Sequence, residues 1–231
     1  MLLDYPGNLV EGRFKARLNR FLALVDVDGR EAGVHVANSG RMRELLVPGY
    51  RVLLKPQPGT HRKTGFDLAL VDLGSTLASA DARLPNVLVA EALGQARLSQ
   101  FAGYPDVRRE VTFGESRLDF MLESPSGRCY LETKSVTLVV DGVGLFPDAP
   151  TVRGAKHMRS LAKAVEDGHR AAVIFIVQRD DCEAFAPHDE ADPVFGAALR
   201  ESVANGVEAY AYSCRVTEKA ITLFRRLPMR L

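Results

Sequence analysis

Residue types that can hydrolyse a phosphodiester stand on two neighbouring apolar runs of the chain. Asp119 precedes a Pro/Gly turn, Ser124–Gly127, and Glu132 and Lys134 follow that turn. Two apolar runs joined by such a turn predict a β-hairpin. Side chains alternate faces along a strand, so Glu132 and Lys134 project from the same face. If Asp119 ends the neighbouring strand on that side, two carboxylates and one ammonium group converge.

These side chains suit a hard divalent cation. Mg²⁺ and Mn²⁺ favour oxygen ligands, and Mg²⁺ takes only one or two carboxylates because it keeps several waters. We therefore expect Asp119 and Glu132 to bind the metal, with the backbone carbonyl of Thr133 as a third ligand and Glu91 as a further candidate. Lys134 would polarise the attacking water or stabilise developing charge, so the catalytic candidates are Asp119, Glu132 and Lys134. The alternative is a solvated strand face with a local Glu132–Lys134 ion pair.

A second polar segment, Phe146–His157, follows the hairpin. It places Asp148, Arg153, Lys156 and His157 around a predicted helix start. Helix N-termini bind phosphate through free N–H groups, so we expect the three basic residues to contact nucleic acid and Asp148 to line the same site. The alternative is a Pro-rich turn followed by a solvated helix face.

Two other places carry candidate contacts. Asn38, Arg41 and Arg43 surround a short predicted helix and are candidate phosphate ligands; the alternative is a capped helix with exposed arginines. Gln178 directly follows an apolar strand, and functional sites often form at strand ends, so it is a candidate site-lining residue. The alternative is an ordinary polar turn. Aromatic residues are only 7% of the chain and Trp is absent, so no strong base-stacking platform is predicted.

The first 80 residues predict a small β domain. Three strands, one helix and two strands are expected in that order, which is the order of an OB-fold barrel that binds oligonucleotides. Small SH3-like barrels and other compact β domains fit the pattern almost as well. The expected strands are Val10–Leu18, Phe21–Val27, Glu31–Val36, Tyr50–Lys55 and Phe66–Leu73, and the expected helix is Arg41–Val47.

Residues 81–231 predict an α/β domain after the connecting stretch Ser75–Leu84. Asn86 is the expected N-cap of the first helix, and an apolar strand near residue 175 suits the centre of a sheet covered on both faces. The order α-β-β-β-α-β is that of the PD-(D/E)XK nuclease core. The fold class is therefore α+β or α/β, with an OB-like β-barrel at 1–80 and a nuclease-like domain at 81–231. Its expected elements are Val87–Ala96, Val107–Phe113, Arg117–Glu123, Arg128–Lys134, Arg153–Asp167, Ala171–Val177, Pro193–Ala204, Val207–Val216 and Ala220–Arg226.

Composition excludes several classes of protein. The 231 residues contain no apolar run long enough to cross a membrane, and the first six residues do not resemble a secretory signal, so we expect a cytoplasmic protein without a membrane partner. Three widely spaced cysteines predict reduced, mostly buried thiols rather than disulfides or a zinc knuckle. The net charge of +1 argues against tight non-specific binding through many phosphates.

Across nearly its whole length the chain resembles the sugar fermentation stimulation protein A family. The resemblance implies an N-terminal OB-like domain, a C-terminal PD-(D/E)XK nuclease-like domain, DNA binding, a role in regulating sugar (particularly maltose) metabolism, and a bacterial or archaeal origin. It also implies Asp119, Glu132 and Lys134 as the nuclease triad. The segments that carry it are Asn38–Arg43, Leu84–Asn86, Arg117–Phe120, Glu132–Leu138, Phe146–His157 and Gln178–Arg179.

The residues and the resemblance together leave three functions open. The first is a Mg²⁺- or Mn²⁺-dependent nuclease that acts on nucleic acid, with DNA as the expected partner. The second is a non-catalytic DNA-binding regulator of sugar (maltose) metabolism genes, and the third is a small-ligand or structural protein. An intact Asp119, Glu132 and Lys134 set favours the first, because a pure scaffold has no reason to hold two carboxylates beside phosphate. A homodimer is a further expectation.

Overall fold

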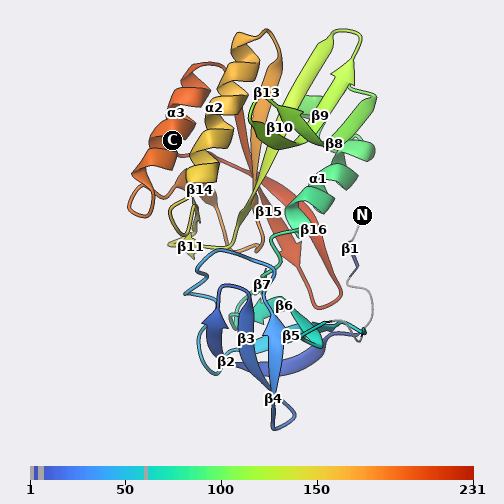
Figure 1. Ribbon diagram of the computed structural model, residues 1–231, viewed down its shortest axis with the longest axis vertical. Coiled ribbons are helices and arrows are strands. Elements are labelled where there is room, and N and C mark those ends of the chain that lie inside the picture. Colours follow the sequence, from blue (N-terminus) through green and yellow to red (C-terminus); the bar gives the residue numbers. More distant parts are fainter. Residues whose placement is uncertain (1–2, 5–7, 60–61) are drawn as a thin grey trace.

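The computed structural model describes residues 3–4, 8–59 and 62–231. A small barrel lies at one end of the molecule and a larger α/β region at the other, as Figure 1 shows. The N-terminal stretch that predicted no secretory signal lies partly outside the described residues. None of the helices in the described part of the chain is both long and apolar enough to cross a membrane.

Five strands close into the barrel, because β4 pairs with both β3 and β6. Alternation along each strand sends one set of side chains inward, so Phe14, Val25, Val34, Leu54 and Leu68 are fully buried inside. This confirms the predicted OB-like fold of the N-terminal region. The strands are β2 (Val10–Asn19), β3 (Leu22–Val27), β4 (Arg30–His35), β5 (Arg51–Pro56) and β6 (Phe66–Asp72), and β7 (Leu77–Ser79) extends the sheet beside β6 within the predicted connecting stretch.

The predicted helix Arg41–Val47 is wrong: this segment is a single turn in which Leu45 and Leu46 both donate to the carbonyl of Met42. Its backbone groups are engaged elsewhere. Arg17 donates to the carbonyls of Gly40 and Arg41, and Met42 N–H donates to Asp148 Oδ2 at 2.9 Å, across to the larger region. Met42 also has a φ of 47°, which lies outside the right-handed helical region, so a helix cannot run through it.

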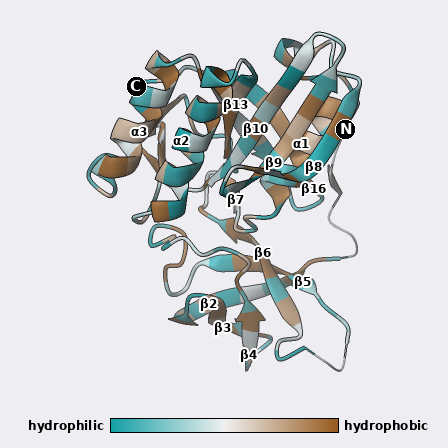
Figure 2. Cartoon of the chain, turned by 45° about the horizontal axis from the view of Figure 1, so that its top comes forward, coloured by the Kyte–Doolittle hydropathy of each residue, from teal (hydrophilic) through white to brown (hydrophobic). Residues whose placement is uncertain are grey.

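The larger region is a seven-stranded sheet in the order β1-β16-β15-β13-β10-β9-β8, with helices on both faces. Helix α1 covers one face, and α2 and α3 cover the other (Figure 1). Figure 2 shows α1 as mostly hydrophobic, whereas α2 mixes hydrophilic and hydrophobic residues, as an amphipathic surface helix does. The elements are β1 (Leu3–Asp4), α1 (Leu84–Gly94), β8 (Asp106–Phe113), β9 (Ser116–Ser124), β10 (Gly127–Val136), α2 (Val152–Glu166), β13 (Arg170–Val177), α3 (Pro193–Ala204), β15 (Glu208–Val216) and β16 (Ala220–Leu227).

The predicted α-β-β-β-α-β order is confirmed as α1, β8, β9, β10, α2 and β13. Strand β13 lies between β10 and β15 and pairs with both in parallel. Its Phe175 packs on the α2 side and its Ile174 on the α1 side, so the strand is buried on both faces, as its apolar sequence predicts. A small sheet of β11 (Val139–Val140), β12 (Val143–Phe146) and β14 (Ala184–Pro187) and the 3₁₀ turn Ser99–Phe101 complete the region.

Helix α1 begins earlier than the sequence predicts. Its N-cap is Arg83, without a side-chain cap, and Pro85 stands in the first turn, where proline is compatible with a helix. Asn86 is therefore inside the helix rather than at its N-cap. All three cysteines are free and buried, which confirms the predicted thiols.

Candidate metal and catalytic site

Glu132, Lys134 and His157 form a buried cluster on the face of β10 that α2 covers. Glu132 and Lys134 are two residues apart on the strand, and His157 comes from the second turn of α2. Lys134 Nζ donates to Glu132 Oε1 at 2.7 Å, and His157 Nδ1 contacts the same oxygen. All three residues are buried. The structure therefore fixes one carboxylate oxygen between two cationic or donor groups.

His157 has a defined role in this cluster. Arg153 Nε donates to His157 Nε2 at 3.3 Å, so that nitrogen is an acceptor. The ring proton of neutral His157 then lies on Nδ1 and is donated to Glu132. We expected His157 to contact nucleic acid, but the structure buries its ring and uses it to position Glu132. Arg153 is exposed at the start of α2 and holds His157 in turn.

The electrostatics keep Glu132 ionised. Burial raises the pKa of the Glu132 carboxyl, but the Lys134 ammonium and the hydrogen bond from His157 outweigh it, so the pKa lies below its usual value. The second oxygen, Oε2, is buried and has no hydrogen-bond partner in the described part of the chain. An unsatisfied buried acceptor costs about 1–3 kcal/mol, and more when it is charged. Glu132 Oε2 is therefore positioned to accept a ligand.

Asp119 lies where β9 and β10 part. The ladder between the two strands ends at the pair Phe120 and Leu131, so Asp119 and Glu132 are the next residues in register. Asp119 Oδ2 accepts from the backbone N–H and the hydroxyl of Thr133, both at 2.7 Å. The N–H and C=O of one strand residue point to the same edge, so the Thr133 carbonyl also faces this gap.

Asn86 orients Asp119 from α1. Its side-chain Nδ2 donates to Asp119 Oδ1 at 2.7 Å, and its Oδ1 accepts from the Thr133 hydroxyl. The carboxylate is thus held by the Thr133 backbone N–H and by Asn86 Nδ2, from two elements, and the single proton of the Thr133 hydroxyl is shared between Asp119 Oδ2 and Asn86 Oδ1. Asn86 is a site residue that local sequence reasoning missed, since it was interpreted as a helix cap. The signal available was Pro85, which favours a helix start one turn earlier and so frees Asn86 for another contact.

The donors present fit a cation that keeps several waters. Asp119 and Glu132 are opposite each other in register where the β9–β10 ladder ends, with Asp119 held by Asn86 of α1 and Glu132 by His157 of α2. One or two carboxylates and the Thr133 carbonyl, completed by waters, are the kind of donors that Mg²⁺ takes. The fourth candidate, Glu91, lies elsewhere on α1 and lines a separate small hollow with Leu223. Within residues 3–4, 8–59 and 62–231, no three His, Cys, Asp or Glu side chains gather as a site made of side chains alone would need.

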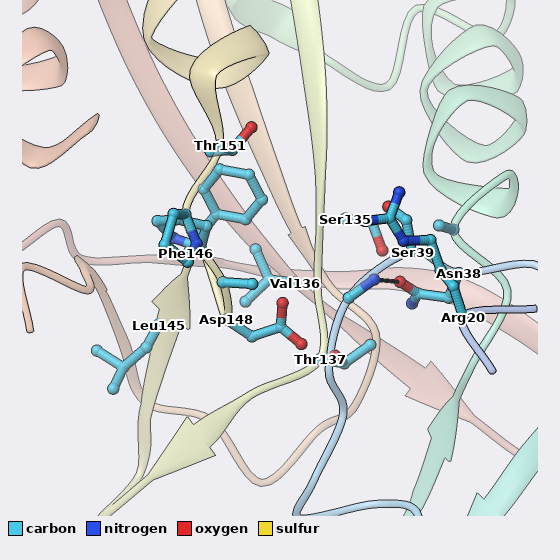
Figure 3. Close-up of a pocket in the computed structure, with 15 residues that line it drawn as sticks. Arg20, Asn38, Ser39, Ser135, Val136, Thr137, Leu145, Phe146, Asp148 and Thr151 are labelled. Atoms are coloured by element: carbon cyan, nitrogen blue, oxygen red, sulfur yellow. Dashed lines mark hydrogen bonds between the residues drawn. The ribbon is translucent and has the colours of Figure 1, made fainter. Parts of the chain in front are cut away.

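A pocket of about 310 Å³ opens between the barrel and the α/β region, next to this cluster. Figure 3 shows Asp148 and Phe146 on one wall and Arg20 and Asn38 on the other. Ser135, the residue after Lys134, also lines it. The pocket thus connects the end of β10 with the barrel, and Asp148 is one of its lining residues.

The remaining predicted contacts are dispersed around the interdomain pocket. Arg41 and Arg43 are exposed and line an adjoining hollow with Asp148. Asn38 is buried, and its Oδ1 accepts from Gly40 N–H at 2.9 Å. Its side chain therefore shapes the pocket wall.

Two other predicted residues are engaged with protein partners. Lys156 is exposed on α2 and pairs with Glu115 at 3.2 Å. Gln178 is fully buried, and its Nε2 donates to Ser135 Oγ at 2.9 Å. Gln178 thus supports the pocket wall from behind rather than lining it.

Comparisons with known proteins agree with this architecture. Residues 83–220 match the model described as "Sugar fermentation stimulation protein RE domain", and residues 16–80 match "SfsA N-terminal OB domain". A sugar fermentation stimulation protein homolog of Caldanaerobacter subterraneus subsp. tengcongensis is 46% identical over the full length of both chains. A homolog of Chloroflexus aggregans is 49% identical over 96% of this chain and 85% of its own. The solved structure of Pyrococcus furiosus SfsA in complex with Ca²⁺ superposes with a TM-score of 0.92 at 30% identity, over the full length of both chains.

Proposed function

The chain belongs to the sugar fermentation stimulation protein family, and we propose that it is a divalent-metal-dependent nuclease that hydrolyses phosphodiesters in nucleic acid, with DNA as the expected substrate. One observation carries this proposal. The buried, ionised Glu132 keeps one oxygen without a partner while Lys134 and His157 fix the other. A carboxylate that served only an internal ion pair would gain by satisfying both oxygens.

Mg²⁺ or Mn²⁺ is the proposed cofactor, held by Asp119, Glu132 and the Thr133 carbonyl. When bound, such an ion neutralises charge on the phosphate and lowers the pKa of coordinated water. Asn86 and Thr133 keep Asp119 aimed at the gap between β9 and β10.

Lys134 supplies the positive charge of the site. Its Nζ is held at 2.7 Å from Glu132 Oε1, inside a cluster that is largely shielded from water. A fixed ammonium group in such a place stabilises negative charge that develops on a phosphate far more than it would in bulk water. His157 contacts Glu132, and Arg153 donates to His157, so both are positioning residues that act through Glu132.

The proposed nuclease activity is tested by a cleavage assay on several kinds of nucleic acid. Labelled single- and double-stranded DNA and RNA of one sequence are incubated with wild-type protein and Mg²⁺, Mn²⁺ or EDTA. Cleavage that requires the metal supports the proposal, and the preferred strand identifies the substrate. Binding of DNA without cleavage on every substrate would favour the non-catalytic regulator of sugar metabolism genes instead.

The exposed arginines of the barrel give a separate prediction. If Arg41 and Arg43 contact phosphates, the double variant Arg41→Ala with Arg43→Ala releases two fewer counterions on binding. The slope of log K against log salt should fall by about 1.8 on duplex DNA or about 1.4 on a single strand. Fluorescence anisotropy at several salt concentrations measures this slope.

A matched double variant controls for the loss of charge. Arg108→Ala with Arg128→Ala removes two exposed arginines that pair with Glu123 at the turn end of the β9–β10 hairpin, away from Asp119. Its slope should equal that of wild type. An unchanged slope in the Arg41 and Arg43 variant would remove these two residues from the nucleic-acid surface.

A further inference from the structure

A second pocket lies on the barrel itself, between the turn that joins β2 to β3 and the residues before β6. Its volume is about 420 Å³. We call it the Phe21 pocket after the aromatic residue in it. The lining residues that matter here are Asn19, Phe21, His35, Arg62, Lys63 and Thr64.

Phe21 presents an open aromatic surface to this pocket. Its side chain is 47% exposed, although it is large and apolar. The ring stacks against His35, with centroids 6.3 Å apart and planes 30° from parallel. Exposed aromatic rings of this kind are the surfaces on which unpaired bases stack, because every base has a π face. The sequence did not predict such a surface, since its aromatic residues are few and far apart.

The turn that carries Phe21 is held in place before any ligand arrives. Arg17 donates to the carbonyl of Asn19 at 3.3 Å and to that of Arg20 at 2.6 Å. Asn19 Oδ1 accepts from Phe21 N–H at 2.9 Å, and the Phe21 carbonyl accepts from Val36 N–H at 3.0 Å. A ring fixed in this way loses little conformational entropy when it binds a ligand.

The charge around the pocket is positive. Lys63 is exposed beside the pocket, and Arg62 contributes a guanidinium that also pairs with Asp67. A stacking surface next to cations fits a ligand that carries both flat rings and phosphates. An apolar protein segment would cover the ring but would supply no anion to the Lys63 ammonium.

The Phe21 pocket adjoins the interdomain pocket. Arg20 lines the interdomain pocket, and the next residue, Phe21, lines the other. The interdomain pocket in turn reaches Ser135, beside Lys134. Consecutive residues of one turn therefore line the two pockets, so a strand with one base on Phe21 lies beside Arg20 and the interdomain pocket.

We propose that the Phe21 pocket binds an unpaired base, so that nucleic acid reaches Lys134 as a single strand. The bases of a duplex are already paired and stacked, so they cannot stack on Phe21 without unpairing. The path from the pocket to the cluster depends on the proposed nuclease function, whereas base binding at Phe21 does not.

Binding is measured in EDTA, so that no metal-dependent cleavage interferes. The probe is a labelled single-stranded DNA that contains 2-aminopurine, compared with the same sequence as a duplex. Phe21→Ala should weaken binding of the single strand about 5- to 150-fold, the range for one lost base stack, and should abolish quenching of the 2-aminopurine fluorescence. Duplex binding should change less than about twofold.

Phe224→Ala is the matched control, because Phe224 is a phenylalanine of similar exposure (44%) on β16. It should bind the single strand as wild type does. Equal affinity and quenching in wild type and Phe21→Ala would overturn the proposal, as would a wild-type protein that binds neither probe. If Phe21-dependent binding is found but no metal produces cleavage, base binding stands and the nuclease function fails.

Discussion

Lys134→Met lowers kcat for strand cleavage by at least about 100-fold, the cost of removing one group that stabilises charge in a transition state. Methionine keeps the length of the side chain and removes the ammonium that lies 2.7 Å from Glu132 Oε1. Affinity for the uncleaved strand changes little, because Lys134 is buried and contributes little to initial contact. Single-turnover cleavage and anisotropy measure the two quantities.

The same variant tests the stability of the cluster. Removing Lys134 leaves the ionised Glu132 with His157 as its remaining hydrogen-bond donor. Loss of one partner from a buried ion pair costs about 3–5 kcal/mol, so the variant is assayed at a temperature where circular dichroism shows it folded. Lys163→Met, at the exposed end of α2, is the control and cleaves as wild type does. A folded Lys134→Met protein with wild-type kcat would show that Lys134 has no part in the reaction.

Glu132→Gln weakens Mn²⁺ binding by more than about 100-fold. Glutamine has the same shape, and its carbonyl oxygen can still accept from Lys134 and His157. It lacks the charge that the unpartnered Oε2 offers. Residues that only orient a metal ligand already change affinity about 10- to 100-fold, so loss of a ligand exceeds that range. Titration calorimetry of metal-free protein with Mn²⁺ measures the change.

Glu123→Gln provides the comparison for this substitution. Glu123 lies on β9, at the other end of the same hairpin, and pairs with Arg128 at 2.8 Å. Its replacement should leave the Mn²⁺ dissociation constant unchanged. Equal Mn²⁺ affinity in wild type and Glu132→Gln would place the cation elsewhere or exclude it.

Local patterns predicted much of the fold because each element repeats one physical signal. Alternation of apolar residues predicted the barrel strands, and the wholly apolar run that contains Phe175 predicted a strand buried on both faces. The Pro/Gly turn predicted the hairpin of β9 and β10. Glu132 and Lys134 lie on one face because a strand has a period of two. These features are determined by residues that are close together in the sequence.

The failed or missing predictions all depend on partners far away in the chain. The segment at Met42 is not a helix because Met42 has a φ of 47°, and its N–H donates to Asp148, 106 residues later. Asn86 is not a cap because its side chain donates to Asp119, 33 residues later, and accepts from Thr133, 47 residues later. His157 faces Glu132 instead of solvent for the same reason. A single sequence carries no signal for such contacts.

Incorporation of oxygen from solvent is the most direct test of the account. Wild-type protein is incubated with a DNA single strand and Mn²⁺ in ¹⁸O-labelled water, and the new phosphate ends are analysed by mass spectrometry. We expect one ¹⁸O for each bond cleaved, with product that disappears in EDTA and in Glu132→Gln. Product that is equal in wild type and Glu132→Gln, or no product above the EDTA background, would contradict hydrolysis at this site.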